Sequence, residues 1–223
     1  MQFAIDENGI RTSINNAIKG KLYRCPCCGT EVIQKKGDIM IWHFAHKSLA
    51  DCVDYYDHKG EWHRAMQELF PEKNREVYEK TATYRHIFDV LTDKGCIIEF
   101  QHSPMSYSEF ERRTSDYHTR SKLKDTPRPV WVFDFSERDF SVSSKKYDSN
   151  PRLRKLFWKR ATNIFRDYSE FKWNEWYELW IFIKPCDGCE SGFVRVMSTY
   201  NECKVIVGEV YSEQQFKRYI TSL

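Results

Sequence analysis

The segment Ile87–Gln101 constrains the fold more than any other part of the chain, because it has the pattern of two strands joined by a tight turn. Apolar and β-branched residues fill both halves (IFDVLT and CIIEFQ), and the tripeptide DKG separates them. A three-residue hairpin loop ends in a left-handed residue, and Gly95 adopts that conformation without steric cost. The segment therefore predicts an antiparallel hairpin in which Thr92 faces Cys96.

The register of this hairpin predicts that acidic side chains meet. Counting equally along both strands from the turn places Asp89 opposite Glu99, with Cβ atoms ~4.5–5.5 Å apart. Gln101 lies two residues after Glu99 and shares its face. Facing carboxylates repel each other and need a cation, and Mg²⁺ prefers such oxygen ligands. The pattern favours a divalent-metal site that polarises a phosphodiester and activates water. The alternative is an acid on the solvent side of a half-exposed strand.

The sequence around the hairpin predicts a mixed sheet with helices packed on it. A helix is expected over Glu61–Phe70, because a proline disfavours helix in the residue before it and Pro71 follows. Ser106 and Glu109 form a capping box, which opens a second helix running to about Lys124. Strands are expected over Val77–Tyr84, His86–Leu91, Cys96–Gln101 and Pro127–Phe135.

Composition divides the 223 residues into three regions. Residues 1–57 carry four of the eight cysteines, residues 58–142 include the hairpin, and residues 143–223 begin in a polar stretch. A run of ~18 apolar residues, which a membrane-spanning helix needs, does not occur, so no membrane partner is expected. The first residues include Asp6 and Glu7 instead of an apolar leader, so we expect a cytoplasmic protein. The net charge of +3 is too small to indicate a partner.

The spacing of cysteine and histidine in residues 1–57 predicts a zinc-binding module. In a reducing cytoplasm, cysteines indicate metal binding more than disulfides. Cys25 and Cys28 form a C-x₂-C pair, and His43, His46 and Cys52 follow. A structural zinc ion takes four ligands, so four of these five residues are expected to bind it, with His43 and Cys52 competing for the last place. The alternative is a set of ordinary buried thiols and histidines.

The third region predicts a basic helix at about residues 151–169. Pro151 suits a first helical turn, and apolar residues recur at helical spacing. Arg152, Lys155 and Lys159 belong to a concentration of cations in its first half. Such cations contact nucleic-acid phosphates irrespective of base sequence. A basic face that is only solvated is the alternative.

Several strings within residues 20–135 resemble the competence protein CoiA-like family and the PD-(D/E)XK nuclease superfamily in its E-x-Q variant. The strings are Arg24-Cys25-Pro26, His43-Phe44-Ala45-His46, Trp62-His63, Asp89, Ile98–Pro104, Glu109, Arg113, Tyr117 and Trp131–Asp134. The resemblance implies an α/β restriction-endonuclease-like core, a mixed sheet flanked by helices, behind an N-terminal zinc-binding module.

The resemblance also implies a metal site. Asp89 and Glu99 hold Mg²⁺ or Mn²⁺, and Gln101 orients a water or a phosphate oxygen at a position where lysine is commoner. One further acid is expected to assist. The candidates for it are Glu68, Glu61 and Glu79.

Three more residues receive roles from the resemblance. His63 is expected to face the active site, with an ordinary surface histidine as the alternative. Arg113 is expected to contact phosphate with support from Tyr117, and the alternative is a surface ion pair between Glu109 and Arg113.

The function expected is metal-dependent hydrolysis of phosphodiester bonds in single- or double-stranded DNA. The rival expectation is a zinc-containing nucleic-acid-binding protein that keeps the nuclease fold without catalysis. The sequence gives no indication of the oligomeric state.

Overall fold

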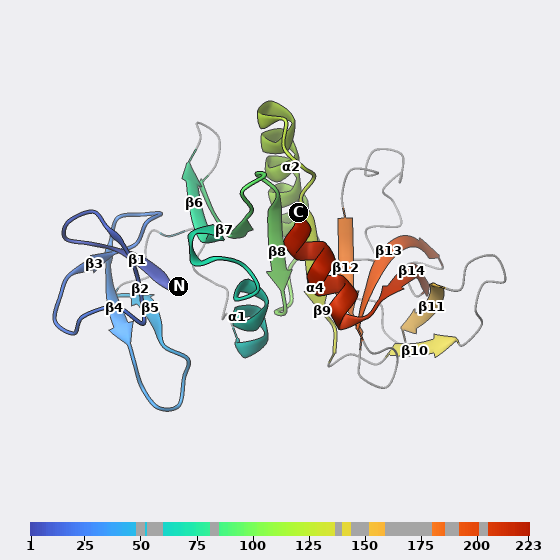
Figure 1. Ribbon diagram of the computed structural model, residues 1–223, viewed down its shortest axis with the longest axis horizontal. Helices are drawn as coiled ribbons and strands as arrows, with labels where there is room; N and C mark the ends of the chain where they lie inside the picture. Colours follow the sequence, from blue (N-terminus) through green and yellow to red (C-terminus); the bar gives the residue numbers. More distant parts are fainter. Residues whose placement is uncertain are drawn as a thin grey trace. The chain divides into compact units, whose positions relative to one another are not determined.

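A computed structural model divides the chain into two compact units, Met1–Leu91 and Thr92–Leu223 (Figure 1). The structure describes residues 1–47, 52, 60–80, 85–136, 140–143, 152–158, 180–185, 192–200 and 205–223. The first unit joins residues from both sides of the predicted boundary at 57/58, because its later elements pack with the N-terminal strands. The predicted domain boundaries at 57/58 and 142/143 stay predictions.

The first unit begins with a five-stranded antiparallel sheet in the order β2-β1-β3-β4-β5. Its strands are β1 (Phe3–Asp6), β2 (Arg11–Ser13), β3 (Tyr23–Arg24), β4 (Glu31–Lys35) and β5 (His43–His46). The sheet encloses a small core in which Ile14, Tyr23 and Phe44 are the large side chains, together with buried cysteines. A small core of this kind gains from a further source of stability, such as a metal ion.

The rest of this unit is α1 (Glu61–Gln67), a 3-10 turn η1 (Glu72–Asn74) and the antiparallel strands β6 (Arg75–Lys80) and β7 (Arg85–Leu91). The helix ends before the predicted Phe70, because its last residues form turns in which the amides of Leu69 and Phe70 bond carbonyls three residues earlier. Tyr78 and Ile87 pack against the core of the five-stranded sheet.

The second unit is built on strands in the order β10-β11-β14-β13-β12-β9-β8. Its elements are β8 (Ile97–Gln101), α2 (Tyr107–Lys124), β9 (Val130–Asp134), β10 (Phe140–Ser143), β11 (Leu153–Trp158), β12 (Trp180–Lys184), β13 (Phe193–Tyr200), β14 (Val205–Tyr211) and α4 (Glu213–Ser222). Strands β8, β9 and β12 are parallel, and the other pairs are antiparallel. The predicted mixed sheet is confirmed.

Helices cover both faces of this sheet. Phe110 of α2 packs on Trp131 of β9, with ring centroids 4.9 Å apart. Phe216 of α4 packs on Phe182 of β12, with centroids 5.2 Å apart. Phe182 is in register with Val132, which points to the face opposite Trp131 because side chains alternate along a strand. Glu99 is in register with Trp131 and therefore lies on the face covered by α2.

The start of the second unit has the predicted turn and one half of the predicted capping box, since the Glu109 carboxylate bonds Arg112 and Arg113. The amide of Thr92 donates to the carbonyl of Cys96 at 2.9 Å, and Gly95 has φ +81°. Ser106 caps α2 by accepting a hydrogen bond from the amide of Glu109 at 3.2 Å. Asp89 and Glu99 belong to different compact units, so their opposition across the hairpin stays a prediction.

The predicted basic helix at 151–169 is wrong where the structure describes it. Residues Leu153–Trp158 form strand β11 between β10 and β14. Side chains in a strand alternate, and Leu156 is fully buried in register with Ile206 of β14. Long-range pairing has overridden a segment whose apolar spacing also suits a helix. Residues 159–169 lie outside the described part of the chain.

Among the described residues, no helix is both long and apolar enough to cross a membrane.

Candidate metal centre and candidate nuclease residues

Four side chains of the first unit converge on one point. The ligand atoms of Cys25, Cys28, His46 and Cys52 all lie within 4.8 Å of one another. Cys25 Sγ is 3.9 Å from Cys52 Sγ, and Cys28 Sγ is 3.3 Å from His46 Nε2. Four ligands around a tetrahedral zinc ion with ~2.3 Å Zn–S bonds lie ~3.5–3.8 Å apart. The cluster thus fits the spacing and the donor set of a structural zinc site.

A tight turn holds the first two thiols. The amide of Cys25 donates to Thr30 O at 2.8 Å, and the amide of Gly29 donates to Cys25 O at 2.9 Å. Gly29 has φ +74°, a conformation that other residues adopt only at a cost. His46 and Cys52 then come from β5 and from the segment after it.

The protonation of the cluster depends on burial. Burial raises the pKa of the Cys25 thiol to about 12. At Cys28 burial acts in the same direction, but hydrogen bonds with Thr30 outweigh it and lower the pKa. Burial also lowers the pKa of His46, which favours the neutral imidazole that a metal needs. A bound cation would favour the Cys25 thiolate and so reverse the effect of burial.

The cluster leaves out His43. Its Nδ1 is 2.8 Å from the carbonyl oxygen of Ile41. Of the two residues that the sequence left in competition, the structure gathers Cys52 with the other candidates.

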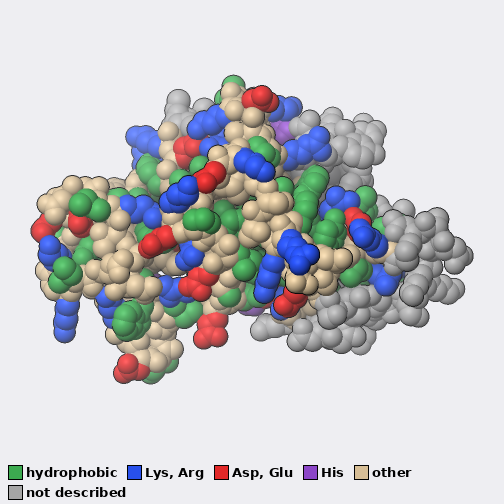
Figure 2. Space-filling view, in the orientation of Figure 1, with side chains coloured by type: hydrophobic (Ala, Val, Ile, Leu, Met, Phe, Trp, Pro, Cys, Tyr) green, Lys and Arg blue, Asp and Glu red, His purple; other side chains and the backbone are tan. Residues whose placement is uncertain are grey.

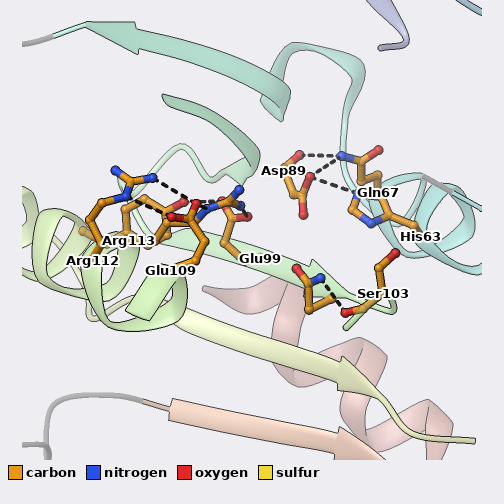
Figure 3. A network of polar contacts seen from close by, with 10 residues as sticks. His63, Gln67, Asp89, Glu99, Ser103, Glu109, Arg112 and Arg113 are labelled. Carbon is orange, nitrogen blue, oxygen red and sulfur yellow. Dashed lines mark hydrogen bonds and ion pairs between the residues drawn. The ribbon is translucent and has the colours of Figure 1, made fainter. Parts of the chain in front are cut away.

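In the same unit, Asp89 of β7 is buried against α1 (Figure 3). His63 Nε2 lies 2.9 Å from Asp89 Oδ1. The side-chain amide of Gln67 donates to Asp89 Oδ1 and to the Asp89 carbonyl, each at 3.2 Å. His63 and Gln67 are buried and stand one turn apart on α1, so the helix offers two contacts to one carboxylate.

A further acid, Glu76 in β6, was missed by sequence reasoning. It is buried, and it lies between Arg75 and Val77, which pair with Val90 and Phe88 in the register of β6 and β7. Its φ of +43° is rare for a residue with a side chain, and such backbones cluster at functional sites. Its charge and its place in a strand gave no signal that the side chain is buried.

In the second unit, Glu99 of β8 is buried against α2 (Figure 3). The hydroxyl of Tyr117 donates to Glu99 Oε1 at 3.2 Å, and Arg113 Nη1 lies 3.9 Å from Glu99 Oε2. Arg113 also bonds Glu109 at 2.7 Å, so the Glu109–Arg113 ion pair and the contact with Glu99 coexist. Burial acts to lower the pKa of Arg113, but its attraction to Tyr117, Glu99 and Glu109 raises it well above its usual range.

Gln101 is buried at the end of β8, and its side-chain amide donates to Ser103 O at 2.8 Å. His102 Nδ1 lies 3.1 Å from Asp134 Oδ2, and Asp134 Oδ1 accepts from the amide of Ser136 at 3.0 Å. His102 directly follows β8, and Asp134 is the last residue of β9. Because the two strands are parallel and Gln101 is in register with Phe133, the histidine and the aspartate are neighbours at the ends of adjacent strands.

The remaining predicted residues lie apart from these groups. Glu68 is at the C-terminal end of α1 and forms an exposed ion pair with Arg64 at 3.5 Å. Glu61 is exposed in the first turn of α1, and Glu79 is half-buried in β6.

The predicted phosphate-contacting cations are on or next to β11. The side chain of Arg152 is 67% exposed and lies 3.7 Å from Glu209, and Lys155 is half-buried in the strand. Lys159 lies outside the described residues. Figure 2 shows basic and acidic side chains interspersed over the face it draws, so the described surface there offers no field of one sign.

Comparison with protein families gives two matches. The model of the competence protein CoiA N-terminal domain matches residues 8–54, and that of the CoiA nuclease-like domain matches residues 61–165. No curated protein and no solved structure is significantly similar to this chain. The first match spans all four residues of the metal cluster, and the second spans Asp89, Glu99 and the helix that contacts Glu99. The nuclease-like match agrees with the PD-(D/E)XK pattern and with the α/β fold. The chain belongs to the competence protein CoiA-like family.

Proposed function

We propose that this protein is a nuclease that hydrolyses phosphodiester bonds of DNA with the help of Mg²⁺ or Mn²⁺. The observation that carries the proposal is that the nuclease-like match includes two buried acids, Asp89 and Glu99. Burial of an ionised carboxylate is costly unless it is bonded or paired. Each of these acids has side-chain donors directed at it, which keeps it in a fixed orientation.

Both carboxylates have the chemistry of a Mg²⁺ site, because hard divalent ions bind carboxylate oxygens. When bound, such an ion polarises the phosphodiester and lowers the pKa of a water molecule. Asp89 and Glu99 are proposed to hold it together, and this pairing rests on the hairpin register that the sequence predicts.

The surrounding side chains have distinct parts in the proposal. His63 and Gln67 orient Asp89, with the contacts of 2.9 and 3.2 Å described above. Tyr117 orients Glu99 by its hydroxyl. Arg113 places a positive charge beside Glu99, where it can also attract a phosphate.

Gln101 shares the face of Glu99 and is proposed to hold a water or a phosphate oxygen by its amide. An amide cannot act as a general base. In this proposal the attacking water therefore loses its proton to solvent or to a phosphate oxygen.

The metal cluster of the first unit is proposed to hold a structural zinc ion through Cys25, Cys28, His46 and Cys52. Three thiols and one imidazole are a complete tetrahedral set. A complete set leaves no position for substrate, so this ion would stabilise the small N-terminal core and take no part in hydrolysis.

Nicking of supercoiled plasmid and cleavage of single-stranded DNA, each in Mg²⁺, Mn²⁺ and chelator, test the proposal. Asp89→Asn and Glu99→Gln should be inactive, while melting temperatures measured in chelator show whether each variant is folded. Glu111→Gln is the matched control, because Glu111 is an exposed acid on α2, and it should keep full activity. Parental activity in either active-site variant would remove that carboxylate from the proposed metal site.

A non-catalytic nucleic-acid-binding protein with the same fold is the second candidate. The observation that favours it is Gln101, an uncharged side chain whose amide already bonds the backbone carbonyl of Ser103. This candidate predicts DNA binding that does not depend on Asp89 or Glu99, and no cleavage in either metal.

A further inference from the structure

The N-terminal strand reaches Asp89 through two buried amides. Gln2 Nε2 donates to Gln67 Oε1 at 2.6 Å, and Gln67 Nε2 donates to Asp89 Oδ1 at 3.2 Å. All three residues are at most 9% exposed, and Gln67 is fully buried. Gln2 directly precedes β1 of the five-stranded sheet, whereas Gln67 lies on α1 and Asp89 on β7.

The direction of donation along this chain of hydrogen bonds is set by the Asp89 carboxylate at its end. An ionised carboxylate only accepts hydrogen bonds, so Gln67 must present its NH₂ group to Asp89. The carbonyl oxygen of Gln67 then points the other way, where a buried acceptor needs a donor. Gln2 supplies that donor. Without it, the Gln67 amide loses the partner that keeps it from rotating away from Asp89.

Gln2 is itself held at its backbone. Its amide donates to Glu76 Oε2 at 2.7 Å, and its carbonyl accepts from the amide of Ile14 at 2.7 Å. Arg11 of β2 donates to the carbonyls of Arg75 and Glu72, so a second strand of the module is bonded to the segment that carries Glu76. The buried carboxylate of Glu76, on its unusual backbone, is thus satisfied by the amide of Gln2.

We infer that Gln2 is a positioning residue, through which the zinc-binding module keeps Gln67 and hence Asp89 in the orientation that catalysis needs. The inference rests on the proposed nuclease function and adds a role for the N-terminal module within it. In this view the module supports the catalytic site through Gln2, in addition to holding the structural zinc ion.

A double-mutant cycle tests this role. Gln2→Leu should lower kcat for plasmid nicking about 10–100-fold, as loss of a partner that orients a metal ligand does. KM for DNA should stay within about twofold of the parent's, because Gln2 orients a proposed metal ligand and is not proposed to bind DNA. In a Gln67→Leu background, Gln2→Leu should have no further effect on kcat, because Gln2 acts through Gln67. Gln34→Leu is the matched control. Gln34 lies on β4 of the same sheet and bonds the backbone carbonyl of Ile18, and its replacement should leave kcat unchanged.

Two results would overturn the inference: an unchanged kcat in folded Gln2→Leu, or the same fold-reduction in both backgrounds, which marks a purely structural role. If Gln2→Leu does not fold, Gln2→Asn replaces it, since the shorter amide keeps polarity but does not reach Gln67. If the parent shows no cleavage, the proposed function fails, and the side-chain amide NMR signals of Gln67 decide the positioning role. They should shift in Gln2→Leu and not in Gln34→Leu, and unchanged signals would refute it.

Discussion

Replacement of Cys52 by serine tests the metal cluster at the ligand that the sequence left undecided. The sequence left Cys52 and His43 in competition, and the structure gathers Cys52 with Cys25, Cys28 and His46. The Cys25–Cys52 Sγ distance of 3.9 Å is close to that of two thiolates on one zinc ion. A serine hydroxyl stays protonated near neutral pH and is a poor zinc ligand, so Cys52→Ser leaves a three-ligand site.

The expected loss is large. Structural zinc contributes about 10–16 kcal/mol to small modules, so an equal share is about 3 kcal/mol for each of four ligands, or about a hundredfold in zinc affinity. The large side chains of the core beside the cluster are few, with Ile14, Tyr23 and Phe44 foremost. That core cannot offset such a loss, so the N-terminal sheet should unfold at a lower temperature.

Competition of the protein with a chromogenic zinc chelator measures the affinity, and metal analysis after gel filtration gives the stoichiometry. The parent should retain about one zinc per chain. His43→Asn is the matched control, because His43 lies on the same strand as His46 but contacts the carbonyl of Ile41. If Cys52→Ser kept parental zinc affinity while His43→Asn lost it, the assignment of the fourth ligand would be wrong.

Three further variants test other parts of the structure. Tyr117→Phe removes the hydroxyl bonded to the buried Glu99 and should cost about 1.5–3 kcal/mol in urea unfolding with chelator present, whereas an unchanged midpoint would mean that water replaces the hydroxyl. Gly95→Ala forces a side chain onto a residue with φ +81° and should cost about 1–2 kcal/mol in the same assay; no loss would show that the turn rearranges. If Arg152 and Lys155 contact phosphates, their double alanine variant should reduce the slope of log affinity against log salt by about 1.8, and an equal slope would leave them as solvated cations.

Signals within a few residues of each other predicted the structure well. Gly95 in the turn and the Ser106 cap of α2 both have the conformations that their sequence patterns indicate. The spacing of Cys25 and Cys28 also indicated that the two thiols lie close together, and the structure gathers them in one cluster, because the metal-binding spacing is local. In each case the residues that determine the geometry are neighbours in the chain, so no tertiary information was needed.

Signals that depend on distant partners were missed or misread. The run LRKLFW at 153–158 suits a helix by its apolar spacing and a strand by its alternation, and only pairing with β14 decides between them. Gln2 and Glu76 are polar residues without a motif, and both are buried where the Gln2 amide bonds the Glu76 carboxylate, 74 positions apart in the chain. Likewise, Glu68 was a candidate for the assisting acid, but it lies exposed at the C-terminal end of α1 and pairs with Arg64.

The two buried acids differ in what holds them, and the difference bears on how a metal site would work. Glu99 has a guanidinium 3.9 Å away, so part of its charge is balanced without a metal ion. Gln67 fixes the direction of Asp89 but adds no positive charge, and His63 adds one only when it is protonated. A divalent cation should therefore gain more from Asp89 than from Glu99, because a carboxylate that is oriented but less neutralised attracts a cation more strongly. The side chains that fix Asp89 reach back to Gln2, so if Asp89 binds a metal as proposed, Gln2→Leu should weaken metal binding at Asp89.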